Sequence, residues 1–259
     1  MNWYFIAALA LCLANFFLHK PISDVCDAVL ARVGFRLYDR GALLAFSVVC
    51  VAAVAPLAAR RRQALTDRVT FGVLVILGAL TVVAQHWLLV TNIGLIHLPQ
   101  FGVIAALLYA GGLSAPAAWL AATAAGVVDE IYQYLVIYAG RSDVYFDYND
   151  MILNAIGAAW VVVLLSAGAR AVPTGSVPGR SLMQKGMVGA GLLLALLGAW
   201  WLQPPQLRPF LRVAATYREY HLLSLAEGLL TVIFIWALVR LAAARRAMPE
   251  VDSPRRLRE

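Results

Sequence analysis

Charged residues are scarce in this chain of 259 residues: aspartate, glutamate, lysine and arginine make up 14%, whereas hydrophobic residues make up 62%. A soluble domain is typically about 25% charged and about 45–50% apolar. This shortage excludes a soluble enzyme and a disordered chain. The net charge of +7 does not indicate a nucleic-acid binder, because the basic residues lie between and beyond long apolar runs and form no stripe of their own.

Cysteine and short catalytic motifs are also scarce. The three cysteines, Cys12, Cys26 and Cys50, are an odd number, and two of them lie inside apolar runs, so no disulfide framework is predicted. The sequence contains no GxSxG nucleophile elbow, no Walker A loop, no GxGxxG fingerprint and no HExxH zinc pattern. Carboxylates and one histidine could hold a divalent ion, but their spacing matches no standard zinc pattern, so we expect neither a metal centre nor a cofactor.

The abundant hydrophobic residues form eight long runs. A helix that crosses the hydrocarbon core of a bilayer needs about 20 mostly apolar residues. We predict an all-α fold, a polytopic bundle of about eight membrane-spanning helices, at 2–18, 41–59, 69–90, 96–113, 115–138, 150–166, 184–202 and 222–241. The first run lacks the basic start and the small-residue cleavage site of a secretory signal peptide, so it counts as a span.

Basic residues between the runs indicate the orientation of the bundle. With the N-terminus in the cytoplasm, the cytoplasmic segments hold 13 of the 21 lysines and arginines and the outer segments hold 8. The positive-inside rule therefore favours both termini in the cytoplasm. The outer segment 19–40 contains an amphipathic pattern that begins at Ser23 and Asp24, which predicts a capped helix on the membrane surface.

A stretch rich in proline and glycine, VPTGSVPG at 172–179, is the clearest linker in the chain. It separates six predicted spans from a final pair. We divide the chain into an N-terminal helical pair with an amphipathic loop at 1–68, a core at 69–170, a C-terminal helical pair at 180–244 and a basic cytoplasmic tail at 245–259.

One group of ionisable residues stands out inside the apolar runs. Asp129 and Glu130 lie in the middle of a predicted span, Asp150 begins the next one, and the only other carboxyl group within a span is the isolated Glu227. An ionisable side chain is costly in the bilayer, and it usually marks a functional site or pairs with another polar group. The two adjacent carboxyl groups therefore need polar partners from other helices.

Helical spacing predicts where those partners lie. Glu130 and Gln133 share one helical face with Asp129 at its edge, and Asp150 and Asn154 share a face of the next helix. The short loop between these helices is too small for a domain, so it caps both polar faces. The predicted constellation opens toward the extracytoplasmic side and contains His97, Asp129, Glu130, Gln133, Arg141, Asp147, Asp150 and Asn154.

The same residues carry a family resemblance. DEIYQ supplies D-E-x-x-Q, Arg141 follows, DMILNAIG supplies D-x-x-x-N-x-x-G, and His97 precedes Gln-Phe-Gly at the start of an apolar helix. Over roughly 70–166 the chain resembles the VanZ-like family of bacterial membrane proteins, which is named for a teicoplanin-resistance accessory protein. The resemblance implies the bacterial cytoplasmic membrane and a role in the cell envelope or in antibiotic resistance, and it implies no particular reaction.

Three functions are compatible with this constellation. The first is a binding module for membrane lipids and for a lipid-linked cell-wall precursor or a peptide-containing ligand, contacted by Gln133, Arg141, Asp147, Asp150 and Asn154. The second is an intramembrane hydrolase or transferase with Glu130 or Asp129 as the general base, His97 as an acid or second base and Arg141 as an electrostatic stabiliser. The third is a proton-coupled transporter in which the two carboxyl groups relay protons.

Each candidate residue also has a purely structural interpretation. The polar cluster would then join three helices, Asp150 would cap its helix, and Arg141 would pair with a neighbouring aspartate. His97 would be an interfacial residue, and Glu227 would hydrogen-bond to a neighbouring helix. The positions of these side chains in three dimensions decide between the two kinds of interpretation.

Overall fold

The computed structural model describes residues 2–60, 66–140, 146–167, 212–214 and 219–244. This part of the chain is nearly all helical. Its elements are α1 (Trp3–Val33), α2 (Phe35–Arg60), α4 (Arg68–Trp87), the 3-10 helix η1 (Asn92–Ile96), α5 (His97–Ala110), α6 (Ala115–Tyr132), the π-helix η2 (Gln133–Ile137), α7 (Tyr148–Ser166), β1 (Arg212–Ala214), β2 (Glu219–His221) and α9 (Leu225–Ala244).

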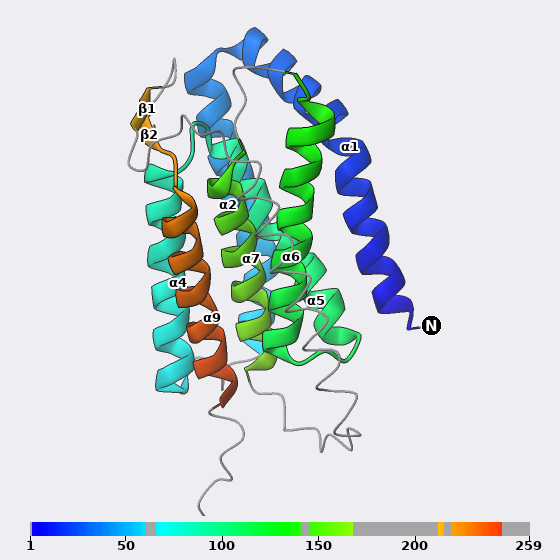
Figure 1. The fold of residues 1–259 in the computed structure, drawn as a ribbon. Helices are drawn as coiled ribbons and strands as arrows, with labels where there is room; N and C mark the ends of the chain where they lie inside the picture. The colour runs from blue at the N-terminus through cyan, green and yellow to red at the C-terminus, as the bar shows by residue number, and fades with distance from the viewer. Residues whose placement is uncertain (1, 61–65, 141–145, 168–211, 215–218, 245–259) are drawn as a thin grey trace, which may run out of the picture.

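The helices lie side by side in one elongated bundle (Figure 1). Six segments of the described chain are long and apolar enough to cross a membrane, namely Trp3–Val33, Arg68–Trp87, Asn92–Ala110, Ala115–Ile137, Tyr148–Ser166 and Leu225–Ala244. The helical bundle predicted from the sequence is confirmed at this level. The predicted span at 184–202 lies outside the described residues. The antiparallel hairpin of β1 and β2, in a segment predicted as a loop, is a small departure from the all-α prediction.

The N-terminal pair differs from the prediction of a short span followed by a separate surface helix at 23–33. Helix α1 continues through Pro21 to Val33, and Asp24 forms an ion pair with Lys20 one turn earlier instead of capping a new helix. The chain breaks only at Gly34, whose φ of 78° lies in the left-handed region that glycine adopts without a steric penalty. A proline disturbs one turn of a helix, whereas this glycine ends it.

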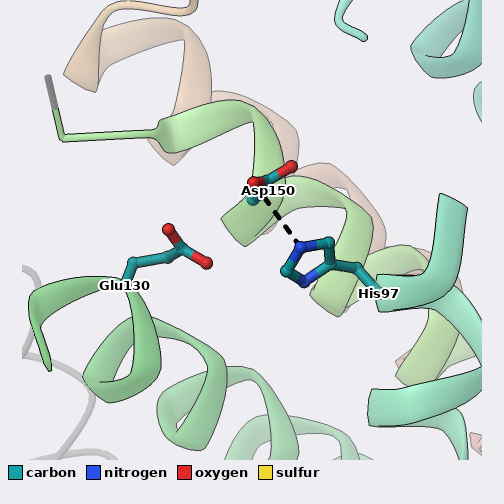
Figure 2. Close-up of side chains that lie close together, drawn as sticks. All are labelled: His97, Glu130 and Asp150. Atoms are coloured by element: carbon teal, nitrogen blue, oxygen red, sulfur yellow. Dashed lines mark ion pairs between the residues drawn. The ribbon is translucent and has the colours of Figure 1, made fainter. Parts of the chain in front are cut away.

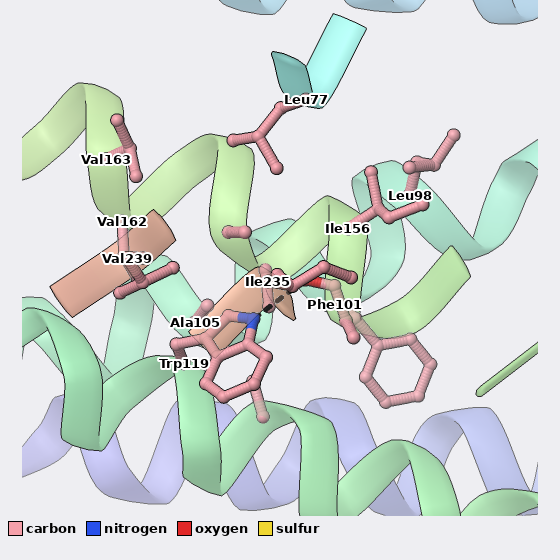
Figure 3. Packing of buried hydrophobic residues seen from close by; sticks show 14 of the residues in the cluster. Leu77, Leu98, Phe101, Ala105, Trp119, Ile156, Val162, Val163, Ile235 and Val239 are labelled. Atoms are coloured by element: carbon pink, nitrogen blue, oxygen red, sulfur yellow. Dashed lines mark hydrogen bonds between the residues drawn. The ribbon is translucent and has the colours of Figure 1, made fainter. Parts of the chain in front are cut away.

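Helix α7 is the centre of the bundle and packs against α4, α5, α6 and α9. Trp119 of α6 is fully buried against it and donates a hydrogen bond from Nε1 to the carbonyl oxygen of Ala155 at 2.8 Å (Figure 3). Gly157 lets α5 approach so closely that a Cβ atom there would lie 2.2 Å from the carbonyl oxygen of Leu98. A glycine in a membrane span permits such close packing of two helices.

The turns at one end of the bundle are tied together by two buried amides. Asn149 donates hydrogen bonds to the carbonyl oxygens of Leu88 and His221 and accepts one from the backbone N–H of Leu223. Asn92 donates hydrogen bonds from its backbone N–H and its side-chain Nδ2 to the two carboxylate oxygens of Asp39. These contacts fix the ends of α4, α7 and α9 relative to one another. The first turns of α5 and α7, which carry the polar cluster, lie at this end (Figure 1).

Candidate functional site

Side chains from three helices converge near this end of the bundle. His97 is the first residue of α5, Glu130 lies near the end of α6, and Asp150 lies in the first turn of α7. One nitrogen or oxygen atom from each of the three lies within 4.8 Å of the other two, and Figure 2 shows their polar ends directed toward one another. His97 and Glu130 are buried and Asp150 is partly exposed. We call these three residues the three-helix cluster.

The imidazole ring of His97 is oriented from both sides. Its Nδ1 lies 2.9 Å from Oδ1 of Asn154, one turn after Asp150 on α7. In the neutral tautomer with the proton on Nδ1, this nitrogen donates to the amide oxygen and Nε2 carries no proton. Nε2 lies 3.5 Å from Oδ2 of Asp150. The ring also stacks on Phe101 with an interplanar angle of 10°.

Gln133 joins the two carboxyl groups of α6. Its Nε2 donates to Oε1 of Glu130 at 3.1 Å and to Oδ2 of Asp129 at 3.2 Å. Both carboxyl groups are almost completely buried, with 1% of Asp129 and 3% of Glu130 exposed. Gln133 is also the first residue of the π-helix η2, a widened turn of a kind that occurs often at functional sites.

Two buried polar atoms beside the cluster have no hydrogen-bond partner among the described residues: Oδ1 of Asp129 and Nδ2 of Asn154. Among these residues, no lysine or arginine forms an ion pair with Asp129, Glu130 or Asp150. A buried polar atom without a partner costs roughly 1–3 kcal/mol, and a buried charge costs more. The site therefore has capacity to bind a group that the described residues do not supply.

Asp147, rather than Asp150, caps helix α7. Its side chain accepts a hydrogen bond from the backbone N–H of Asn149 at 2.8 Å. Burial, and next the negative charge of Asp150, raise the pKa of Asp147 to about 8, although the backbone N–H groups of Asn149 and Asp150 favour its charged form. The capping interpretation of Asp150 is thus wrong, and its carboxyl group is available to the three-helix cluster.

A cavity of about 730 Å³ leads to the cluster from the side of α1 and α2. Its walls are mainly apolar and come from α1, from the segment 88–96 and from α5. His97, Asp147 and Asp150 line it, and so do Asn15 and His19 of α1. The contribution of α1 was missed at the sequence level, because Asn15 and His19 are isolated polar residues whose spacing shows no pattern.

The structure brings most of the predicted constellation together. His97, Asp129, Glu130, Gln133, Asp150 and Asn154 are linked by the distances given above, and Asp147 joins them along the cavity. Arg141 lies outside the described residues, so its predicted pairing with Asp147 or Asp150 stays a prediction.

Glu227 belongs to a different arrangement, away from the cluster. It accepts hydrogen bonds from the backbone N–H and the hydroxyl group of Ser224, and the backbone N–H of Glu227 donates to that hydroxyl oxygen. This is a capping box at the start of α9, and His221 lies against the same carboxyl group at 3.0 Å. The four-residue pattern Ser-Leu-Ala-Glu in the sequence could have identified it.

Comparison with known proteins gives no relative for this chain. No family model, no curated protein and no solved structure matches it.

Proposed function

We propose that this chain is a multi-pass protein of the bacterial cytoplasmic membrane that binds an amphiphilic cell-envelope component, a lipid-linked or peptide-containing cell-wall molecule, at the extracytoplasmic side. The observation that carries the proposal is the cavity of about 730 Å³, which combines apolar walls with a polar end at His97, Asp147 and Asp150. Ligand pockets in proteins are typically about 300–1,000 Å³, mostly apolar, with a few convergent polar groups.

The walls of the cavity match the two parts of an amphiphile. Leu11, Leu18 and Leu30 of α1 and Val103 of α5 offer apolar surface to a hydrocarbon chain. At the polar end the groups are mainly hydrogen-bond acceptors. They favour a head group that is rich in hydroxyl and amide N–H donors, as in sugars and peptides, over a bare phosphate.

Two features of the sequence support this proposal. The excess of basic residues in the predicted cytoplasmic segments puts the polar end of the cavity on the extracytoplasmic side. The resemblance to the VanZ-like family implies a role in the envelope, and it rests on His97, Asp129, Glu130, Gln133, Arg141, Asp150 and Asn154.

The experiment is a binding titration with the full chain in lipid nanodiscs, followed by tryptophan fluorescence. The probe is a polyprenyl diphosphate that carries a sugar–peptide head, and the reference is the same polyprenyl diphosphate without the head. We expect saturable binding of the probe at least about tenfold tighter than binding of the reference, a difference of about 1.4 kcal/mol. Equal affinities would show that the polar end does not recognise the head group.

A second candidate function is an intramembrane hydrolase or transferase. The observation that favours it is the position of His97, whose Nε2, unprotonated when the proton is on Nδ1, lies 3.5 Å from Asp150 and faces Glu130 (Figure 2). Such a nitrogen accepts a proton from an attacking water or hydroxyl group. Incubation of the full chain with the same probe tests this candidate. Turnover that is lost in Glu130→Gln while probe binding persists supports catalysis, and an unchanged probe in the wild type contradicts it.

A further inference from the structure

We propose that the three-helix cluster is a divalent-cation site, with Zn²⁺ as the preferred ion and with Nε2 of His97 and the carboxylates of Glu130 and Asp150 as ligands. The cation binds with or without an amphiphile, so the inference goes beyond the proposed function. The sequence predicts no metal centre, because the ligands come from three separate helices and no short motif records them. The sequence predicts that the three residues share one constellation, and the fold adds that one ligand atom from each lies within 4.8 Å of the other two.

The ligand geometry is close to that of a tetrahedral zinc site. Nitrogen and oxygen ligands that are about 2.0–2.1 Å from a tetrahedral zinc ion lie about 3.4 Å from one another. Nε2 of His97 and Oδ2 of Asp150 are 3.5 Å apart, and the whole set lies within 4.8 Å. Side-chain movements on the order of 1 Å would bring Glu130 into the same shell.

The protonation state of His97 suits metal binding. A metal ion needs the unprotonated nitrogen of a neutral imidazole, and in protein metal sites the other nitrogen usually donates to an oxygen acceptor. Nδ1 donates to Asn154, so the ring is held in the tautomer that presents Nε2 to the two carboxylates. Asn154 is thus a positioning residue that acts through His97.

Glu130 provides independent evidence for an external partner. Its side chain is 97% buried, since 3% is exposed, and it is aimed at His97 and Asp150 (Figure 2). In the described part of the chain its carboxylate receives one hydrogen bond, from Gln133 to Oε1, and none to Oε2. Burial disfavours the charged form of such a carboxyl group, so it is either protonated or ionised beside a compensating positive charge. A divalent cation would neutralise Glu130 and Asp150 together without a lysine or arginine.

The choice of ion follows from the ligands and from access. One imidazole and two carboxylates suit zinc better than magnesium or calcium, which prefer oxygen ligands alone. His97 and Asp150 line the cavity, so a fourth coordination position would face it. Three protein ligands with one open position is the arrangement of zinc sites that bind a water molecule or an exogenous group.

The test uses the full chain without a polyhistidine tag, stripped with a chelator and then titrated with Zn²⁺ in the absence of any amphiphile. We expect one zinc per chain, measured by elemental analysis after gel filtration. His97→Gln, Glu130→Gln and Asp150→Asn should each lower the zinc affinity by more than the roughly 10–100-fold that loss of an outer hydrogen bond costs. A wild type that retains no zinc would overturn the proposal.

The matched control is Glu227→Gln. Glu227 also faces a histidine, His221 at 3.0 Å, but no second carboxylate completes that pair among the described residues. Glutamine can still form the capping box, so this variant should fold and bind one zinc. If it loses zinc as the three cluster variants do, the ion is bound elsewhere and the proposal is wrong.

A measurement on the wild type alone covers the case in which the cluster variants fail to fold. X-ray absorption at the zinc edge should show one imidazole nitrogen and otherwise oxygen ligands at about 2.0–2.1 Å. The chain also has three cysteines and three other histidines. A sulfur ligand or a shell of several imidazoles would assign the ion to those residues and would overturn the three-helix site. Because no amphiphile is present, failure here leaves the binding proposal standing.

Discussion

The Nδ1 atom of His97 lies 2.9 Å from the side-chain oxygen of Asn154, and the two residues come from helices that are separate in sequence. This contact orients the plane of the ring. It therefore determines which nitrogen faces Asp150. The chemistry available at the three-helix cluster therefore depends on an amide that acts through His97.

Replacing Asn154 tests this relationship. Asn154→Leu removes the acceptor for the Nδ1 proton, and we expect zinc affinity to fall by about 10–100-fold. Asn154→Asp keeps an oxygen acceptor at the same place, and it should retain most of the affinity. Isothermal titration with Zn²⁺ measures both variants. If the leucine variant binds as the wild type does, Asn154 does not orient His97.

A bulky side chain in the wall of the cavity should block the amphiphile. Val103 lines the cavity and is 50% exposed. We expect Val103→Trp to weaken binding of the sugar–peptide probe at least tenfold, because the indole fills space that the hydrocarbon chain would occupy. The binding titration in nanodiscs measures this effect, and zinc stoichiometry should not change.

Val75→Trp is the matched control for the cavity. Val75 is 54% exposed on α4 and does not line the cavity. This variant should bind the probe as the wild type does. Equal loss of probe binding in the two variants would mean that the cavity is not the binding site.

The close approach of α5 and α7 should be intolerant of a methyl group. In Gly157→Ala the new Cβ would lie 2.2 Å from the carbonyl oxygen of Leu98, and backbone atoms can yield only if the helices separate. We expect a loss of stability of about 1–3 kcal/mol. Gly72→Ala on α4, where a Cβ meets nothing within 4 Å, should be neutral or stabilising. Thermal unfolding in detergent micelles compares them, and similar melting temperatures would contradict the packing described here.

The capping box of α9 should affect stability alone. Ser224→Ala removes the hydroxyl group that accepts from the backbone N–H of Glu227 and donates to its carboxylate. We expect a loss of about 0.5–2 kcal/mol in thermal unfolding. Zinc stoichiometry and probe binding should stay at wild-type values, and a change in either would link this helix end to the site.

The orientation of the bundle can be tested with fused reporters. The positive-inside rule puts the end that contains Gly140 outside and the turn at Ser114 inside. Alkaline phosphatase, which is active only outside the cytoplasm, should therefore be active when fused after Gly140 and inactive when fused after Ser114. The reverse result would put the polar end of the cavity in the cytoplasm.

Much of this arrangement could be predicted from the sequence because a bilayer makes polar residues conspicuous. Glu130 and Gln133 share a buried face, as helical spacing predicts, and Gly157 permits the close approach that a glycine in a span suggests. Long apolar runs likewise predicted the bundle.

The remainder depends on contacts between distant segments or on local competition. His97, Glu130 and Asp150 were predicted to share one constellation, but the distances between their ligand atoms depend on how α5, α6 and α7 pack, and sequence spacing does not give those distances. At the start of α7, Asp147, Asn149 and Asp150 could each cap the helix, and the capping residue is Asp147. The sequence analysis did not predict that α1 continues through Pro21. A proline alone does not end a helix, and α1 ends at Gly34.

The most direct measurement of the central claim is an experimental structure of the full chain in nanodiscs that contain native bacterial lipids and the sugar–peptide probe. We expect density for the hydrocarbon chain along Val103 and α1, and for the head group beside His97, Asp147 and Asp150. Density confined to the outer surface of the bundle, with none for the probe in this cavity, would contradict the proposed function.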